Sequence, residues 1–240
     1  MDTPRPARPT ISGRALPPRL GRAGAWAVLV LLAACAPEAT REIPRTAPRP
    51  AARPDAAPSL PTADERICRS RLAELGVDFV PLPDLSAGSC SSSNAVTLYH
   101  LASDNTRVVV TNLPRISCTL SQDLSNWTRF GVSRAAQQIL GSPVVKVETF
   151  GSYSCRNVAG SSRLSAHSTA SAVDISGFVL ADGRRITIKG GWQGSEGERQ
   201  FLRTIHQSAC KRFGTVLGPD YNRAHEDHLH LELGGGGFCR

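Results

Sequence analysis

The 240-residue sequence lacks several patterns that identify common classes of enzyme. It contains no P-loop or Rossmann glycine motif, no Gly-x-Ser-x-Gly nucleophile elbow and no internal repeat. It has no Cys-x-x-Cys pair, which argues against a thioredoxin-like centre and against a zinc site built from cysteines. Nucleotide binding and cysteine-based redox catalysis are therefore not expected.

A long apolar run is also missing. The longest uncharged apolar segment, residues 23–34, has twelve residues, whereas a membrane-spanning helix needs about 20. Five arginines precede this segment, as in the positively charged start of a secretory signal. We therefore expect residues 1–34 to be a signal peptide and the protein to be exported.

The end of this segment, Leu32-Ala33-Ala34-Cys35, resembles a bacterial lipobox. The resemblance implies that Cys35 is lipidated and becomes the first residue after cleavage, so that a lipid anchor holds the protein on a membrane. Because Ala36 and not aspartate follows, it also implies sorting to the periplasmic side of the outer membrane. The alternative is an ordinary signal peptide that leaves Cys35 as a free thiol.

Residues 35–62 contain almost no large apolar side chains that could form a folded core. They contain seven prolines mixed with alanine, arginine and threonine, so we expect a disordered tether. The positive charge is concentrated at this end of the chain, with a net +5 over residues 1–60 and only +3 over residues 61–240. A nucleic-acid partner is not expected, because such proteins usually carry their basic residues on the folded domain.

Residues 63–240 are long enough for one folded domain with one core. An even number of cysteines in an exported domain indicates disulfides, although six cysteines allow fifteen connectivities. The candidates are Cys68, Cys90, Cys118, Cys155, Cys210 and Cys239. Hydrophobic periodicity predicts an α+β fold. The predicted helices are 64–75, 120–140 and 195–213, and the predicted strands are 107–111, 144–150, 173–180, 185–189 and 229–233.

Four of the six histidines lie in two short segments that also contain acidic residues. The first segment holds His167 and Asp174, and the second runs from His225 to Glu232. In an extended chain His228 and His230 point to the same face. Two imidazoles beside a carboxylate suit zinc, and a catalytic zinc site needs three protein ligands. His167, Asp174 and one histidine of the second segment would supply them.

Two other interpretations of these residues remain. The histidines would, in the simplest case, only make hydrogen bonds in surface loops. A serine hydrolase would use Ser165, His167 and Asp174, but it would leave the histidine pair of the second segment unexplained.

The folded part resembles the bacterial extensin-like C-terminal domain family from Cys68 to Arg240. The matching motifs run from Gly151 to Asn157, from Ser165 to Ile175, from Cys210 to Pro219 and from His225 to His230, and end with Cys239-Arg240. The histidine segments are also similar to those of the zinc D-Ala-D-Ala carboxypeptidase clan, which shares its fold with the hedgehog signalling domain. This second resemblance implies a small antiparallel sheet with helices.

The resemblance to the peptidase clan implies specific roles. His167, Asp174 and His230 match the zinc ligands. Asp227 matches a general base, and His228 matches a histidine that assists the transition state; which of the two takes the proton stays open. Further implied roles are substrate binding by Tyr153 and Arg156 and, around the ligands, orientation by His225 and Ser165. Ala170 stands where the clan usually has glycine.

The expected function is therefore zinc-dependent hydrolysis of peptide bonds in peptidoglycan stem peptides at the cell envelope. The alternative is a cell-wall-binding lipoprotein that keeps zinc without turnover.

Overall fold

The computed structural model describes residues 60–104, 106–234 and 237–240. The predicted signal peptide, Cys35 and almost all of the predicted tether lie outside these residues. No helix in the described part of the chain is long and apolar enough to cross a membrane.

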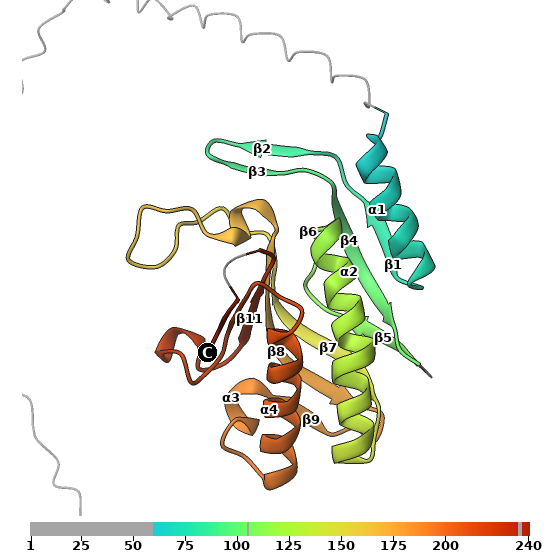
Figure 1. Cartoon of the computed structure of the whole chain (residues 1–240), viewed down its shortest axis with the longest axis vertical. Coiled ribbons are helices and arrows are strands. Elements are labelled where there is room, and N and C mark those ends of the chain that lie inside the picture. The colour runs from blue at the N-terminus through green and yellow to red at the C-terminus, as the bar shows by residue number, and fades with distance from the viewer. Residues whose placement is uncertain (1–59, 105, 235–236) are drawn as a thin grey trace, which may run out of the picture. The chain divides into compact units, whose positions relative to one another are not determined.

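Three helical segments lie on one face of a ten-stranded sheet (Figure 1). The first is α1 (Ala63–Glu74), which begins at a capping box formed by Thr62 and Glu65. The second begins with α2 (Cys118–Trp127) and continues through two π-helical segments, η1 (Thr128–Ser133) and η2 (Ala136–Leu140). The third is α4 (Glu196–Cys210), which follows a short helix, α3 (Ile188–Gly191).

The main sheet has the order β1-β4-β5-β7-β8-β11-β10-β12, with β6 paired to β4 and β9 paired to β8. All pairs are antiparallel except β5–β7 and β10–β12, which are parallel. The strands are β1 (Asp78–Pro81), β4 (Ala95–Ala102), β5 (Arg107–Val110), β6 (Ile116–Ser117), β7 (Val144–Gly151), β8 (Ala172–Leu180), β9 (Arg185–Thr187), β10 (Thr215–Leu217), β11 (Leu229–Glu232) and β12 (Phe238–Cys239). A separate hairpin joins β2 (Leu85–Ala87) to β3 (Cys90–Ser92).

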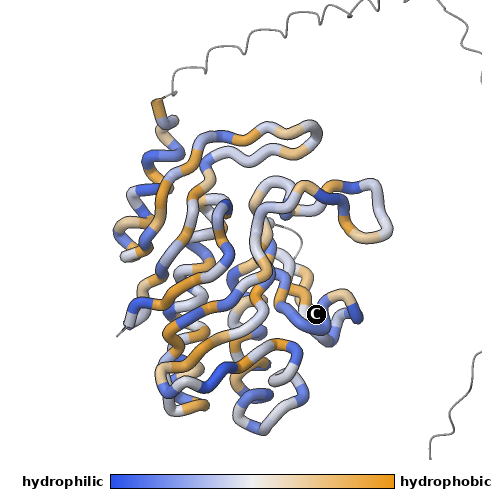
Figure 2. Tube along the Cα trace, turned by 180° about the vertical axis from the view of Figure 1, so that it is seen from behind, coloured by the Kyte–Doolittle hydropathy of each residue, from blue (hydrophilic) through white to orange (hydrophobic). Residues whose placement is uncertain are grey.

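The core lies between the helices and the sheet. Trp127, Phe178 and Phe201 are fully buried, and the Phe178 ring lies 6.3 Å from Trp127 and 5.4 Å from Phe201. The indole nitrogen of Trp127 also donates to the carbonyl oxygen of Ile205, which joins α2 to α4. Figure 2, viewed from behind, shows hydrophobic residues along the strands. The core therefore covers one face of the sheet and leaves side chains on the other face more exposed, among them Tyr99 on β4 and Phe150 on β7.

All six cysteines that were predicted to form disulfides do so. The bonds are Cys68–Cys118, Cys90–Cys155 and Cys210–Cys239. The predicted α+β class and the mostly antiparallel sheet are also confirmed.

The sheet contains several short strands that the sequence pattern did not predict. Residues 78–102 contain four strands that proline, glycine and serine interrupt too often for a clear pattern. The strand at 229–232 is not the last one, since the chain turns back after the glycines and pairs β12 with β10. The helix predicted from residue 120 begins at Cys118. The strand predicted over 185–189 ends at Thr187, because residues 188 and 189 belong to the helix α3.

Candidate metal centre

Asp174 and His230 lie directly opposite each other on neighbouring strands. The antiparallel register of β8 and β11 pairs these two residues. On β11, Leu229 and Leu231 are buried in the core, so the alternation of the strand turns His230 to the opposite face. The burial of Val173 and Ile175 on β8 does the same for Asp174. Core packing on one face of the sheet therefore places a carboxylate and an imidazole together on the other.

His167 reaches the same place from a 3₁₀ turn, η3 (Ala166–Thr169), which precedes β8. The Ser165 hydroxyl caps this turn by accepting from the backbone N–H of His167. Ala170 ends the turn in the left-handed conformation, with φ of 57°. This conformation favours glycine, so alanine is an uncommon residue at this position.

Three ligand atoms converge between these elements. The Nε2 atom of His167 lies 3.2 Å from Nδ1 of His230 and 3.3 Å from Oδ2 of Asp174. Nδ1 of His230 lies 2.9 Å from Oδ1 of Asp174. Ligand atoms in a tetrahedral zinc site with bonds of about 2.0–2.1 Å are separated by roughly 3.3 Å. The spacing of this three-ligand group (His167, Asp174 and His230) therefore fits zinc.

The outer nitrogens of both histidines are held by acceptors. Nδ1 of His167 donates to the carbonyl oxygen of Ser152 at 2.5 Å, so its Nε2 is the ring nitrogen that faces Asp174 and His230. Nε2 of His230 donates to the Glu232 carboxylate at 3.2 Å, which directs Nδ1 inward. Hydrogen bonds of this kind fix the orientation of metal-ligating imidazoles.

The local charges favour a cation between these atoms. Burial would raise the pKa of the Asp174 carboxyl, but hydrogen bonds from His167 and His230 hold that pKa well below its usual range. Burial would lower the pKa of His230, whereas Asp174 and Glu232 raise it to about 9. The position at Nδ1 of His230 therefore stabilises positive charge, which a proton or a metal ion can provide.

His228 faces the three-ligand group, and Asp227 lies behind it. Nδ1 of His228 is 2.9 Å from Oδ1 of Asp227, and its Nε2 is 3.6 Å from Oδ1 of Asp174. The Asp227 side chain is 42% exposed, compared with 14% for His228. The geometry thus brings His228 to the group and Asp227 only to His228.

His225 packs beside His230 on β11 and beside His228, which immediately precedes this strand. Its ring lies 5.1 Å from that of His228 and 6.1 Å from that of His230, and its Nδ1 contacts the Asn222 side chain at 2.7 Å. Burial and the neighbouring imidazoles lower the pKa of His225 to about 4. His225 is therefore a neutral neighbour of the group.

A cleft of about 540 Å³ opens over the group. Asp174, His228 and His230 line it, together with Ser165 and Arg156. The Arg156 guanidinium lies 4.0 Å from the Asp174 carboxylate and is half exposed. Tyr153, which the resemblance pairs with Arg156, is not among the residues that line the cleft.

The structure does not form the serine-hydrolase arrangement. The Ser165 hydroxyl contacts the backbone N–H of His167 and not its ring. Both ring nitrogens of His167 have other partners. Nδ1 contacts the carbonyl oxygen of Ser152, and Nε2 contacts Asp174 and His230. Ser165 consequently has no base at its hydroxyl.

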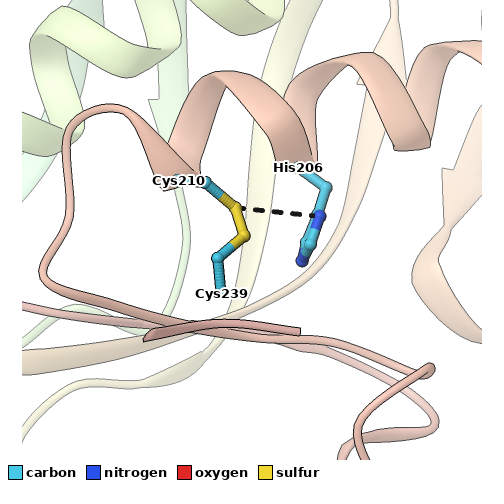
Figure 3. A group of neighbouring side chains, drawn as sticks. All are labelled: His206, Cys210 and Cys239. Atoms are coloured by element: carbon cyan, nitrogen blue, oxygen red, sulfur yellow. Dashed lines mark hydrogen bonds between the residues drawn. A yellow bond between two sulfur atoms is a disulfide. The ribbon is translucent and has the colours of Figure 1, made fainter. Parts of the chain in front are cut away.

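A second group of potential metal ligands consists of His206, Cys210 and Cys239, but a disulfide between the two cysteines prevents metal binding there. The two sulfurs form a disulfide, and Nδ1 of His206 lies 3.9 Å from the sulfur of Cys210 (Figure 3). Disulfide sulfurs are not thiolates, so this group is not a metal site in the oxidised protein.

Sequence reasoning missed two contributors. Glu232 lies two residues after His230 on the same strand face, and the period of two that paired His228 with His230 would have found it. Ser152 acts through its backbone carbonyl, for which the side-chain sequence gives no signal.

Comparison with known proteins gives one match. The sequence model of the family described as extensin-like protein C-terminus matches residues 66–240. No curated protein and no solved structure matches the chain.

Proposed function

The chain belongs to the extensin-like protein C-terminus family, and from this premise and the geometry of the cleft we propose that it is a zinc-dependent peptidase of peptidoglycan stem peptides. The observation that supports this function is the convergence of His167, Asp174 and His230 at an open cleft. Three ligands beside open space are the pattern of a catalytic zinc site, whereas structural sites are closed by four ligands.

The residues that would hold zinc are His167 through Nε2, Asp174 through its carboxylate and His230 through Nδ1. When bound, zinc would supply Lewis acidity toward a peptide carbonyl and toward water. Ser152 and Glu232 hold the two imidazoles in the required orientation through their outer nitrogens.

His228 is the better candidate for the general base. Its Nδ1 faces the Asp227 carboxylate, so in the neutral ring Nδ1 carries the proton. Its Nε2 then has a free lone pair on the side of the cleft and of Asp174. We assign proton transfer to Nε2 of His228, and orientation of its ring to Asp227.

Arg156 is placed to bind an anionic part of the substrate. Its half-exposed guanidinium lines the cleft near Asp174, where a peptide carboxylate or a carbonyl oxygen would gain a charge-assisted hydrogen bond. Tyr153 has no part in this assignment, since it lies outside the cleft.

The proposal includes the place of action. Export by residues 1–34 and a lipid on Cys35 would bring the domain to the periplasmic side of the outer membrane. A tether over residues 35–62 would allow it to reach peptidoglycan.

The test is chromatography of muropeptides released from peptidoglycan treated with the wild-type chain or with variants. We expect shortened or cut stem peptides with wild type and with His100→Ala, a histidine paired with Asp78 on another part of the sheet. His230→Ala and Asp227→Ala are expected to lower or abolish these products. Unchanged muropeptides with metal-loaded wild type would reject the peptidase.

One contact favours a second function, a zinc-containing wall-binding protein. Nε2 of His228 is 3.6 Å from Asp174, close enough for His228 to become a fourth ligand after a small shift. Four protein ligands would make a structural site without turnover. Retention of the protein by intact sacculi without change of their muropeptides would support this function.

A further inference from the structure

Two large aromatic side chains lie exposed in the same cleft. Tyr221 is 43% exposed and Phe238 is 45% exposed, and both line the cleft that contains Asp174 and His230. Their rings contact each other edge to face, with centroids 5.6 Å apart. Neither residue belongs to the core cluster, so burial within the fold does not account for the large apolar surface that this aromatic pair presents.

Phe238 is held by a rigid support. Its strand β12 pairs with β10, and its backbone N–H donates to the carbonyl oxygen of Gly214 at 3.0 Å. The next residue, Cys239, is joined by a disulfide to Cys210 at the end of α4 (Figure 3). The strand therefore cannot leave the sheet while this bond is intact.

Tyr221 has a separate support. Its backbone N–H donates to the carbonyl oxygen of Gly218 at 2.9 Å, which closes a tight turn. The preceding residue, Asp220, accepts from the indole of Trp192 at 2.9 Å and pairs with Arg203. Exposed aromatic rings on fixed supports lose little conformational entropy on binding, which is typical of ligand-contacting surfaces.

The aromatic pair is continuous with the three-ligand group. The Tyr221 ring lies 5.4 Å from that of His225, and the His225 ring lies 6.1 Å from that of His230. Only one side chain thus separates the aromatic pair from the proposed reaction site. A ligand that occupies this cleft at the three-ligand group can therefore also contact the aromatic pair.

The chemistry of this end of the cleft suits a sugar ring better than an apolar side chain. An apolar side chain gains most in a closed pocket, whereas these rings stay almost half exposed. A pyranose has one face of C–H groups that can cover an aromatic ring, and a rim of hydroxyls that needs water or polar partners. Thr215, Asn222 and Arg163 line the same cleft and can meet such hydroxyls.

We propose that Tyr221 and Phe238 form a sugar-stacking subsite, so that the substrate is a stem peptide still attached to its glycan. This inference rests on the proposed function for the peptide part of the substrate. The sugar part is a separate binding event and can be measured separately.

The experiment is isothermal titration of the full chain with three probes. They are the sugar-free stem pentapeptide, the disaccharide N-acetylglucosamine–N-acetylmuramic acid, and the disaccharide-pentapeptide. Chelator-treated protein is used so that no probe is consumed. We expect the disaccharide-pentapeptide to bind at least about 10-fold more tightly than the pentapeptide, as one additional contact of about 1.4 kcal/mol would give.

The variants distinguish the subsite from the rest of the cleft. Tyr221→Ala and Phe238→Ala should remove the 10-fold difference and leave pentapeptide affinity unchanged, whereas Tyr221→Phe should keep it. Tyr99→Ala is the matched control, because Tyr99 is 47% exposed on β4 and does not line the cleft. Circular dichroism of each variant verifies folding.

Equal binding of the two peptide probes by wild type would overturn the subsite, as would a difference that survives both alanine variants. Binding of the disaccharide without any cleavage of stem peptides would support the subsite and reject the peptidase. Cleavage of stem peptides without a sugar-dependent difference in affinity would support the peptidase and reject the subsite.

Discussion

The Nε2 atom of His167 lies 3.2 Å from the Nδ1 atom of His230, although 63 residues separate the two in the chain. Both atoms also lie within 3.3 Å of the Asp174 carboxylate. Each imidazole is held from behind, by a carbonyl oxygen or by a carboxylate. The predictions below follow from this arrangement and from the supports around it.

The proposed zinc site should depend on His167, Asp174 and His230 together. We expect the purified full chain to bind about one zinc, and His167→Ala, Asp174→Ala and His230→Ala each to lose it, because two ligands rarely hold zinc. Elemental analysis after dialysis measures the zinc content, with His100→Ala as control. A wild-type protein without affinity for zinc would reject the metal centre.

The Glu232 carboxylate is placed to orient His230 through its outer nitrogen. Glu232→Ala is expected to weaken zinc affinity by about 10–100-fold. Glu232→Gln should lose less, because its amide oxygen can still accept from Nε2 of His230. Competition with a chromogenic chelator measures the affinity, and Glu74→Ala on α1 is the control. If Glu232→Ala bound zinc as tightly as wild type, Glu232 would have no positioning role.

His228 and Asp227 should differ in their effects on turnover. His228→Ala is expected to lower kcat by about 10²–10⁴-fold while zinc content stays unchanged. Asp227→Asn should cause a smaller loss, since it only weakens the orientation of His228. Steady-state kinetics and zinc analysis on the same samples test both. Loss of zinc from His228→Ala would instead identify His228 as a fourth ligand.

His206 should make folding stability depend on pH. Burial lowers the pKa of His206, against the opposing hydrogen bond to the Arg240 carbonyl; Arg203 lowers it further and Asp220 raises it. Below about pH 6.5 the unfolded chain binds a proton that the folded chain resists, so His206 destabilises the protein as pH falls. Urea unfolding at pH 7.5 and pH 5.0 should therefore show that His206→Gln loses less stability than wild type on acidification. A stability difference between the two proteins that does not change with pH would contradict this.

The Cys90–Cys155 disulfide supports the wall of the cleft. Cys155 precedes Arg156, so Cys90→Ser with Cys155→Ser should raise KM as well as lower the free energy of unfolding by about 2–4 kcal/mol. Removal of Cys68–Cys118, which joins α1 to α2, should cost similar stability and leave KM unchanged. Equal effects of both removals on KM would argue against a role in the cleft.

The sequence by itself determined the features that depend on local pattern and composition. The six cysteines, the α+β class and the strand at His230 followed from number, periodicity and spacing. The two histidine segments could be identified because chemically similar side chains are close together in the chain. Short strands such as β2 and β12 gave too weak a pattern for detection.

Only the tertiary structure decided which of these side chains meet. The register of β8 against β11 sets Asp174 opposite His230, and register depends on how a whole strand packs on the core. The same packing brought His228 toward Asp174 and left Asp227 behind it, a choice that the order of residues leaves open. Disulfide pairing and the exposed position of Tyr221 and Phe238 were likewise set by long-range contacts, which local sequence does not encode.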